Sequence, residues 1–142
     1  MIIAYEMKAG SAMPQSATHR VQSMGTDPGR VLTKAALRAA DILDIPQRTL
    51  ADIIGVSAST VSRAAHGGAP VDPDSKAGEL AKLWVRVFRS LDAIVGSNDE
   101  AARAWINSAN AAFGGEKPID RLRSAEGLIH VLHYLDSARA RL

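Results

Sequence analysis

The stretch Gln47–His66, which reads QRTLADIIGVSASTVSRAAH, decides the fold of this chain. A helix-turn-helix consists of two short helices that cross at a steep angle through a turn of three or four residues. It needs a small residue at the crossing, a residue that tolerates left-handed geometry at the end of the first helix, and an apolar residue directly after it. Ala51, Gly55 and Val56 meet these requirements in register. The stretch therefore predicts a helix-turn-helix.

The two helices of this unit are expected over residues 47–54 and 58–65, with the Ser57 hydroxyl as the cap of the second helix. Helical spacing assigns the apolar side chains to the inner face. They are Leu50, Ile53 and Ile54 on the first helix and Val61, Ala64 and Ala65 on the second. A plain helical hairpin with a glycine turn is the alternative interpretation.

The outer face then carries short hydrogen-bonding side chains and one long cation. Such groups bind base edges and phosphates in a major groove. We expect Arg63 to contact a guanine, and Gln47 with the free amides at its helix start to contact a phosphate. The predicted DNA-binding set is Gln47, Ser57, Ser59, Thr60, Ser62, Arg63 and His66.

The composition indicates a globular, all-α protein. Of the 142 residues, 46% are hydrophobic and 23% charged, and no clear alternating strand pattern is present. The length fits one domain, or two small ones that share a core. The lack of cysteine excludes disulfides, thiolate catalysis and cysteine-based zinc sites. Residues 1–10 lack the apolar run of a signal peptide and no apolar window reaches membrane length, so we expect a cytoplasmic protein with no membrane span.

The net charge of +2 is unevenly distributed. Residues 1–68 hold seven Lys and Arg against five Asp and Glu, whereas residues 69–142 hold ten of each. The excess is therefore on the half that carries the predicted helix-turn-helix. Because the excess is slight, we expect one copy to bind DNA weakly and a dimer to bind it more strongly.

Three segments follow from the breaks in the helical pattern. Residues 1–29 have no sustained period, which predicts a flexible N-terminal arm. Residues 30–70 are the expected helix-turn-helix domain, of the Cro/repressor type, with a first helix that runs from Val31 and ends before Pro46. Residues 71–142 are the expected C-terminal domain.

The strongest helical signal lies at the start of that C-terminal domain. A long helix is expected over residues 73–95, with Asp72 as its cap and Pro73 in its first turn. Its polar side carries Lys82, Arg86 and Arg89, and its apolar stripe consists of Leu80, Leu83, Trp84, Val87, Phe88, Leu91, Ile94 and Val95. The stripe is wide enough to pack its own domain and a symmetry mate, so we expect a homodimer formed through this half.

Shorter helices follow. One is expected after a Ser97 or Asn98 cap, and a short helical turn over residues 118–123. Ser124 is the expected start of the last helix, whose apolar face consists of Leu128, Val131, Leu132, Leu135 and Ala138. The loop 110–118 between them contains two adjacent glycines.

The residues of this second half resemble a known family. The run consists of Trp105-Ile106-Asn107, Asn110, Phe113-Gly114-Gly115, Lys117-Pro118-Ile119-Asp120, Leu122, Ser124, Glu126-Gly127, Val131 and Leu135. It is similar to the C-terminal domain of the Xre/MbcA/ParS antitoxins, whose pattern is Trp, Pro-Asn, Leu-Gly-Gly, Pro-Leu-Asp/Glu and Glu-Gly. Ala109 stands in place of the proline and Phe113 in place of the aliphatic residue before the glycines. The resemblance covers about residues 30–142.

The resemblance implies a partner. Such antitoxins pair with RES-domain toxins that consume NAD or transfer from it, cover the NAD pocket of the toxin, and repress their own operon. It implies a toxin-binding set of Asn110, Gly114, Gly115, Pro118, Arg139, Arg141 and Leu142. In particular, Arg139, Arg141 and the terminal carboxylate are expected to enter a pocket for an anionic cofactor.

Plainer interpretations of the same residues stay open. Trp105 fits a core position, the loop 110–118 fits a structural corner, and the two terminal arginines favour the dipole of a helix end. His130, His133 and Asp136 lie three residues apart and suggest a metal site, but no fourth ligand is evident, and we expect no metal, no cofactor and no catalytic site. The main functional hypothesis is an antitoxin and autorepressor. The alternative is a stand-alone helix-turn-helix regulator whose second half only dimerises or senses a ligand.

Overall fold

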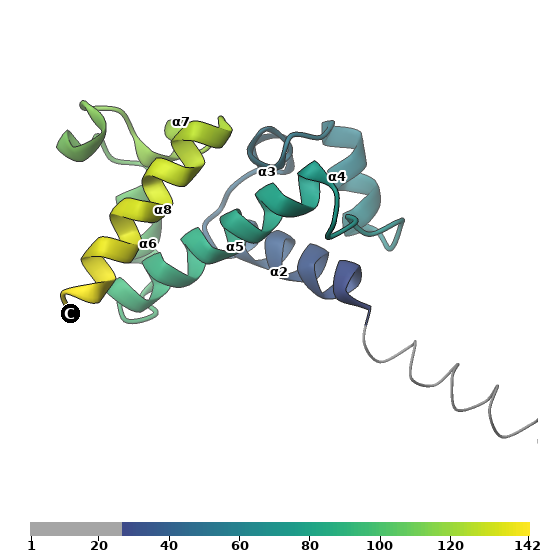
Figure 1. Ribbon diagram of the computed structural model, residues 1–142, viewed down its shortest axis with the longest axis horizontal. Helices are drawn as coiled ribbons and strands as arrows, with labels where there is room; N and C mark the ends of the chain where they lie inside the picture. The colour runs from purple at the N-terminus through teal and green to yellow at the C-terminus, as the bar shows by residue number, and fades with distance from the viewer. Residues whose placement is uncertain (1–26) are drawn as a thin grey trace, which may run out of the picture.

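The computed structural model describes residues 27–142, which form seven α-helices and one short 3-10 turn, with no strand among them (Figure 1). The predicted all-helical fold is confirmed. Of the predicted arm 1–29, residues 1–26 lie outside the described part of the chain. The elements are α2 (Pro28–Ile42), α3 (Gln47–Ile54), α4 (Ala58–Ala65), α5 (Lys76–Ile94), α6 (Asp99–Ile106), η1 (Ala111–Phe113), α7 (Pro118–Arg121) and α8 (Ala125–Ala140).

Helix α2 begins earlier than the sequence pattern predicts. The Asp27 carboxylate caps it by accepting hydrogen bonds from the amides of Gly29 and Arg30, at 3.0 and 3.3 Å. Pro28 follows in the first turn, where its missing N–H removes nothing from the helix. The boundary predicted at residue 29 was therefore too late, because Asp-Pro is a helix start that the apolar periodicity alone does not include.

The helix-turn-helix has the predicted bounds. Gly55 adopts a left-handed φ of 74° at the end of α3, and its amide donates to the Ala51 carbonyl at 2.9 Å. Ala51 is 2% exposed. The Ser57 hydroxyl caps α4 by accepting from the Thr60 amide at 3.2 Å. The prediction for the inner face of α4 was wrong in part: Val61 is buried, but Ala64 is half-buried and Ala65 exposed, because the last turn of α4 borders a surface groove beside α2.

The predicted start of the long helix was also wrong. Asp72 does not cap α5; its carboxylate accepts from the Asp74 amide at 2.9 Å, and its carbonyl accepts from the Ser75 hydroxyl at 2.6 Å. The cap is Ser75, whose hydroxyl accepts from the Gly78 amide at 3.0 Å. The Asp72 turn lies against the first turn of α5, so closely that a Cβ at Gly78 would be 2.1 Å from the Asp72 carbonyl oxygen.

Helix α5 is the central element of the fold. It packs against α2 and α3 of the helix-turn-helix end and against α8 of the other end (Figure 1). Trp84 is fully buried, and its indole Nε1 donates to the Ala36 carbonyl on α2 at 3.0 Å. Lys82, Arg86 and Arg89 are exposed, as predicted.

The apolar stripe of α5 is covered in part from within the chain, and its other members are half-buried. Trp84, Val87 and Leu91 on it are buried. The homodimer predicted to form through this stripe therefore stays a prediction, without an open stripe on α5 to support it.

The remaining helices complete the C-terminal end. Asn98 and Ser124 cap α6 and α8, and α7 is two residues shorter than predicted. Arg103 on α6 joins this end to the other, because its Nε donates to the Ile42 carbonyl at 2.8 Å and lies 3.3 Å from the Asp44 carboxylate. No helix within residues 27–142 has the length and apolar character needed to cross a bilayer.

Candidate functional surfaces

The outer face of α4 carries most of the predicted DNA-binding set. Ser59, Arg63 and His66 are exposed, and Thr60 and Ser62 are half-buried. Among the described residues Arg63 has no acidic partner within 4.0 Å, and its guanidinium makes one long contact, 3.4 Å from the Thr60 hydroxyl. Its charge is therefore available for a guanine or a phosphate.

Local hydrogen bonds organise this face. The Ser57 hydroxyl lies 2.8 Å from the Thr60 hydroxyl and 3.1 Å from that of Ser59. At the other end of α4, the His66 Nδ1 lies 2.7 Å from the Ser62 carbonyl. Because a carbonyl only accepts, Nδ1 is the donor, which leaves His66 Nε2 facing outward. The face thus offers a row of hydroxyls followed by a cation and an imidazole.

Gln47 lies apart from that row, at the exposed start of α3. The residue before it, Pro46, provides no side-chain cap, so the first amides of α3 have no side-chain partner. Arg48, also exposed, lies directly beside it. Sequence reasoning missed Arg48, although its position outside the inner-face spacing of α3 was a usable signal.

The loop 110–118 has a defined shape that its Asn and glycines produce. The backbone N–H of Asn110 donates to the backbone carbonyl of Glu116 at 3.0 Å, and the backbone N–H of Gly115 donates to the backbone carbonyl of Asn110 at 2.9 Å. Gly114 and Gly115 have φ of 65° and 86°, which side-chain-bearing residues rarely adopt. These three predicted toxin-binding residues therefore shape the loop, whereas Pro118 is buried.

An aromatic cluster holds the loop on α8. The ring of Phe113 lies 5.2 Å from the rings of His130 and Tyr134 and 6.2 Å from that of Trp105, all in edge-to-face arrangements. Trp105 also stacks on Tyr134 at 6.2 Å. Phe113 is buried, and Trp105 is half-buried at the edge of the core. The core interpretation of Trp105 is thus correct in part.

Arg121 and Gly127 fix the turn from α7 into α8. The Arg121 guanidinium donates to His130 Nδ1 at 2.6 Å, and this contact requires a nitrogen lone pair on the imidazole. A Cβ at Gly127 would lie 1.9 Å from the Arg121 carbonyl oxygen. The glycine of the Glu-Gly pair thus has a physical reason, because only glycine lets α7 approach α8 this closely.

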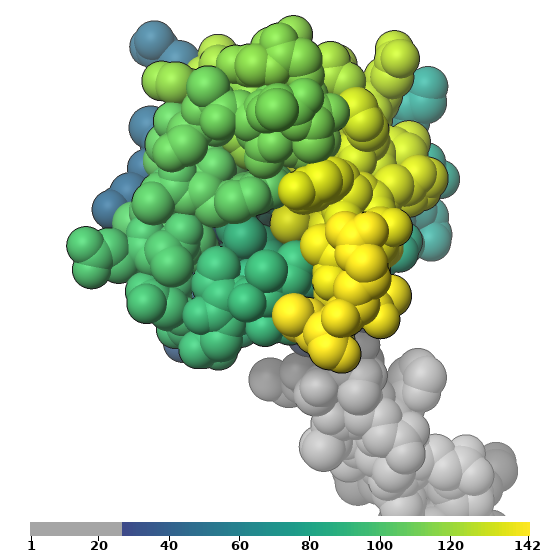
Figure 2. Space-filling model, turned by 90° about the vertical axis from the view of Figure 1, so that its left-hand side faces the viewer, coloured from purple at the N-terminus to yellow at the C-terminus, as the bar shows by residue number. Residues whose placement is uncertain are grey.

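The C-terminal residues form a second exposed patch. Arg139, Arg141 and Leu142 are exposed at the end of α8, and Leu142 is 80% exposed. In Figure 2 the loop region, in green, and the end of α8, in yellow, appear on the same face of the molecule. The two segments lie at different heights on it, so the loop and the end of α8 form two patches on one face, and buried Pro118 belongs to neither. Figure 1 shows α4 at the opposite side of the molecule from the C-terminus.

Two of the three suggested metal ligands on α8 have other partners. Asp136 accepts from the Ser90 hydroxyl at 2.7 Å and pairs with Arg86 at 3.3 Å, and His130 contacts Arg121. Within residues 27–142 no three His, Asp or Glu side chains gather to hold a metal ion.

Two family models match the two ends of the chain. Residues 24–86 match the antitoxin Xre-like helix-turn-helix domain, and residues 90–141 match the antitoxin Xre/MbcA/ParS C-terminal toxin-binding domain. Between residues 24 and 141 the two models leave only residues 87–89 unmatched. The chain belongs to the Xre/MbcA/ParS antitoxin family. The family predicted from the sequence is therefore confirmed.

A solved structure agrees in fold with this Xre/MbcA/ParS family member. A chain in the crystal structure of the M. tuberculosis MbcT-MbcA toxin-antitoxin complex superposes with a TM-score of 0.60 at 23% identity. The match covers 79% of this chain and 96% of that one. No curated protein sequence matches this chain.

Proposed function

We propose that this antitoxin neutralises a RES-domain toxin that consumes NAD, by covering its active site, and represses its own operon through α4. The observation that carries the proposal is the placement of two exposed surfaces at opposite sides of the molecule, with α4 on one side and the loop 110–118 with the end of α8 on the other. The family model that matches residues 90–141 describes that second region as toxin-binding. With the two surfaces apart, a toxin and a DNA duplex do not compete for the same residues.

Charge favours an NAD pocket as the target of the α8 end. Arg139 and Arg141 are exposed, and neither has an acidic partner within 4.0 Å among residues 27–142. A pocket that holds the pyrophosphate of NAD is built to accept negative charge, so arginine side chains fit it. The loop 110–118, held by Phe113, then provides a firm second contact on the same face.

The α4 surface supports operator binding. Ser59, Arg63 and His66 face outward from a helix whose packing side is anchored by buried Val61. In a helix-turn-helix the second helix enters the major groove and reads base edges with such side chains. Gln47 and Arg48, at the uncapped start of α3, are placed for a phosphate. We also propose that the protein is cytoplasmic and has no enzymatic activity of its own.

The test of neutralisation is NAD consumption by the purified RES-domain protein encoded beside this gene. We expect the full chain to co-purify with it and to abolish NAD loss, and a chain without residues 139–142 to fail. A matched control is the double variant Lys82→Ala/Arg89→Ala, which removes two exposed cations from another face and should inhibit fully. If the full chain did not reduce NAD loss, the neutralisation proposal would be wrong, and the alternative function, a stand-alone helix-turn-helix regulator, would take its place.

The test of repression is a gel shift with the promoter region of its own operon. Arg63→Ala should weaken binding by about 5- to 150-fold, the loss expected for a base-reading arginine. Arg123→Ala, an exposed cation on the C-terminal half, is the control and should bind as the unchanged protein does. An unchanged affinity of the Arg63 variant would show that Arg63 does not belong to the DNA-binding set.

A further inference from the structure

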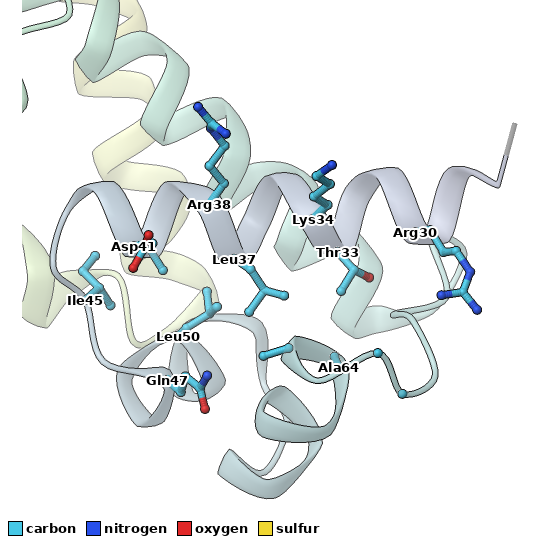
Figure 3. Close-up of a pocket in the computed structure, with 14 residues that line it drawn as sticks. Arg30, Thr33, Lys34, Leu37, Arg38, Asp41, Ile45, Gln47, Leu50 and Ala64 are labelled. Atoms are coloured by element: carbon cyan, nitrogen blue, oxygen red, sulfur yellow. The ribbon is translucent and has the colours of Figure 1, made fainter. Parts of the chain in front are cut away.

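A groove lies between α2 and the helix-turn-helix (Figure 3); it is away from the C-terminal surface, and Gln47 of the predicted DNA-binding set lies at its edge. It has a volume of about 650 Å³, within the range of sites that hold small organic ligands. Residues of α2 form one wall, and the start of α3, the end of α4 and the glycines after α4 form the other. The groove explains why Ala65, predicted to face inward, is exposed.

The floor of the groove is apolar. Leu50, Ile45 and Ala40 are buried beneath it, and in Figure 3 the side chains of Leu37, Leu50 and Ala64 converge there. The polar Thr33 adds no free group, because its hydroxyl donates to the Gly29 carbonyl at 2.7 Å and accepts from the Val71 amide at 2.9 Å. Gln47 adds one polar side chain on the α3 side, and the rest of the floor offers a mainly apolar surface that suits a hydrocarbon body.

The rim of the groove is cationic. Arg30, Lys34 and Arg38 follow one another at four-residue spacing along the edge of α2, against a single acid, Asp41. Arg30 lies 3.4 Å from Asp27, whereas no ion pair within residues 27–142 involves Lys34 or Arg38. Figure 3 shows these two side chains extending from α2 away from the side on which Leu37 and Ala64 lie. Rotation about their flexible stems brings the charges to the mouth of the groove.

An apolar floor under a cationic rim selects one chemical class of ligand. Burial of a hydrocarbon chain stabilises the complex in proportion to the apolar area covered, and the rim cations stabilise an acidic head group left at the mouth. A cationic amphiphile would meet like charge at the same position.

We propose that the groove between α2 and α4 binds an amphipathic organic anion, a hydrocarbon chain with a terminal carboxylate or a similar acidic group. The groove lies away from the C-terminal surface and shares Gln47 with the predicted DNA-binding set, and the proposal does not depend on either function proposed above.

The experiment uses the full chain and dodecanoate below its micelle concentration, followed by NMR of the backbone amides and by calorimetry. The expected result is saturable 1:1 binding, with the largest shifts at Leu37, Leu50 and Ala64. Dodecyltrimethylammonium, which has the same chain length and the opposite charge, should bind at least tenfold more weakly. Equal binding of the two probes, or the lack of saturable dodecanoate binding, would overturn the proposal.

Paired variants distinguish this groove from general attraction of an anion. Lys34→Glu/Arg38→Glu should weaken dodecanoate binding at least tenfold. Lys82→Glu/Arg89→Glu changes the net charge equally at a smaller apolar depression between α2 and α5, and should leave the affinity within about threefold. Ala65→Trp fills the groove from an exposed position, so it should abolish binding while the circular dichroism spectrum stays unchanged. Equal losses in the two charge variants, or full binding by the Ala65 variant, would contradict the assignment.

Discussion

At the residue scale, glycines show what a sequence does and does not reveal. Gly55 was predicted because its role is local: it ends a helix with a φ of 74° inside a recognisable turn. The need for glycine at 127 and 78 arises from the carbonyl oxygens of Arg121 and Asp72, which folding brings close. A resemblance to a family identifies the Glu-Gly pair as a motif, but only the packing of α7 on α8 explains the glycine in it.

Replacing Gly127 with alanine tests that close approach. The added Cβ meets a backbone oxygen that cannot move aside, so we expect Gly127→Ala to lower the free energy of unfolding by at least about 2 kcal/mol. Gly67→Ala is the control, since a Cβ at Gly67 meets no atom within 4 Å and only its φ of 83° is unfavourable. That control should lose about 1 kcal/mol. Urea unfolding measures both, and equal losses would contradict the account.

At the scale of single elements, the predicted helix starts account for most of the agreement and disagreement between the expected and the observed helix bounds. Ser57 was correctly predicted as a cap and Ser124 as the start of the last helix, because each stands just before a helical pattern. Asp72 was predicted wrongly because Asp-Pro resembles a helix start equally well. The Asp72 carboxylate caps a local turn, and Ser75 then begins the helix. Sequence alone does not decide between two adequate caps three residues apart.

Two serine caps provide a matched prediction at this scale. Ser57→Ala and Ser124→Ala each remove one hydroxyl that accepts from a backbone amide, at 3.2 and 3.1 Å, and each should destabilise the protein by about 1 kcal/mol. Only Ser57→Ala should weaken operator binding, because the Ser57 hydroxyl also holds Thr60 and Ser59 on the α4 surface. Fluorescence anisotropy with labelled promoter DNA measures the difference. Equal affinities of the two variants would argue against an ordered role for this cap.

At the scale of the whole molecule, α5 joins the helix-turn-helix end to the C-terminal end, and we expect the two ends to unfold as one cooperative unit. Trp84 hydrogen-bonds α2, Asp136 of α8 accepts from Ser90 on α5, and Arg103 of α6 donates to the end of α2. The sequence predicted the long helix and its stripe. These three hydrogen bonds and the one between Thr33 and Val71 join residues that are 38 to 61 positions apart, and no local pattern specifies them.

The two tryptophans test this cooperativity directly. Trp105→Phe leaves Trp84 as a fluorescent reporter between α5 and α2, and Trp84→Phe leaves Trp105 as a reporter beside α8. Each variant changes stability by its own amount. Within each variant, fluorescence and far-ultraviolet circular dichroism should give coincident urea transitions, as two-state unfolding requires. Separate transitions for the two probes would show that the ends unfold independently.

The central claim is that toxin neutralisation and DNA binding occupy opposite sides of this one body. To test it, the RES-domain toxin is expressed in cells together with the full chain or with one of two variants. Cellular NAD and the output of a reporter driven by the promoter of the operon are both measured. We expect cells with the Arg63→Ala variant to keep their NAD and to lose repression of the reporter. Cells with the chain that lacks residues 139–142 should lose their NAD and keep the repression. Full NAD protection by the shortened chain, or the loss of both activities in either variant, would contradict it.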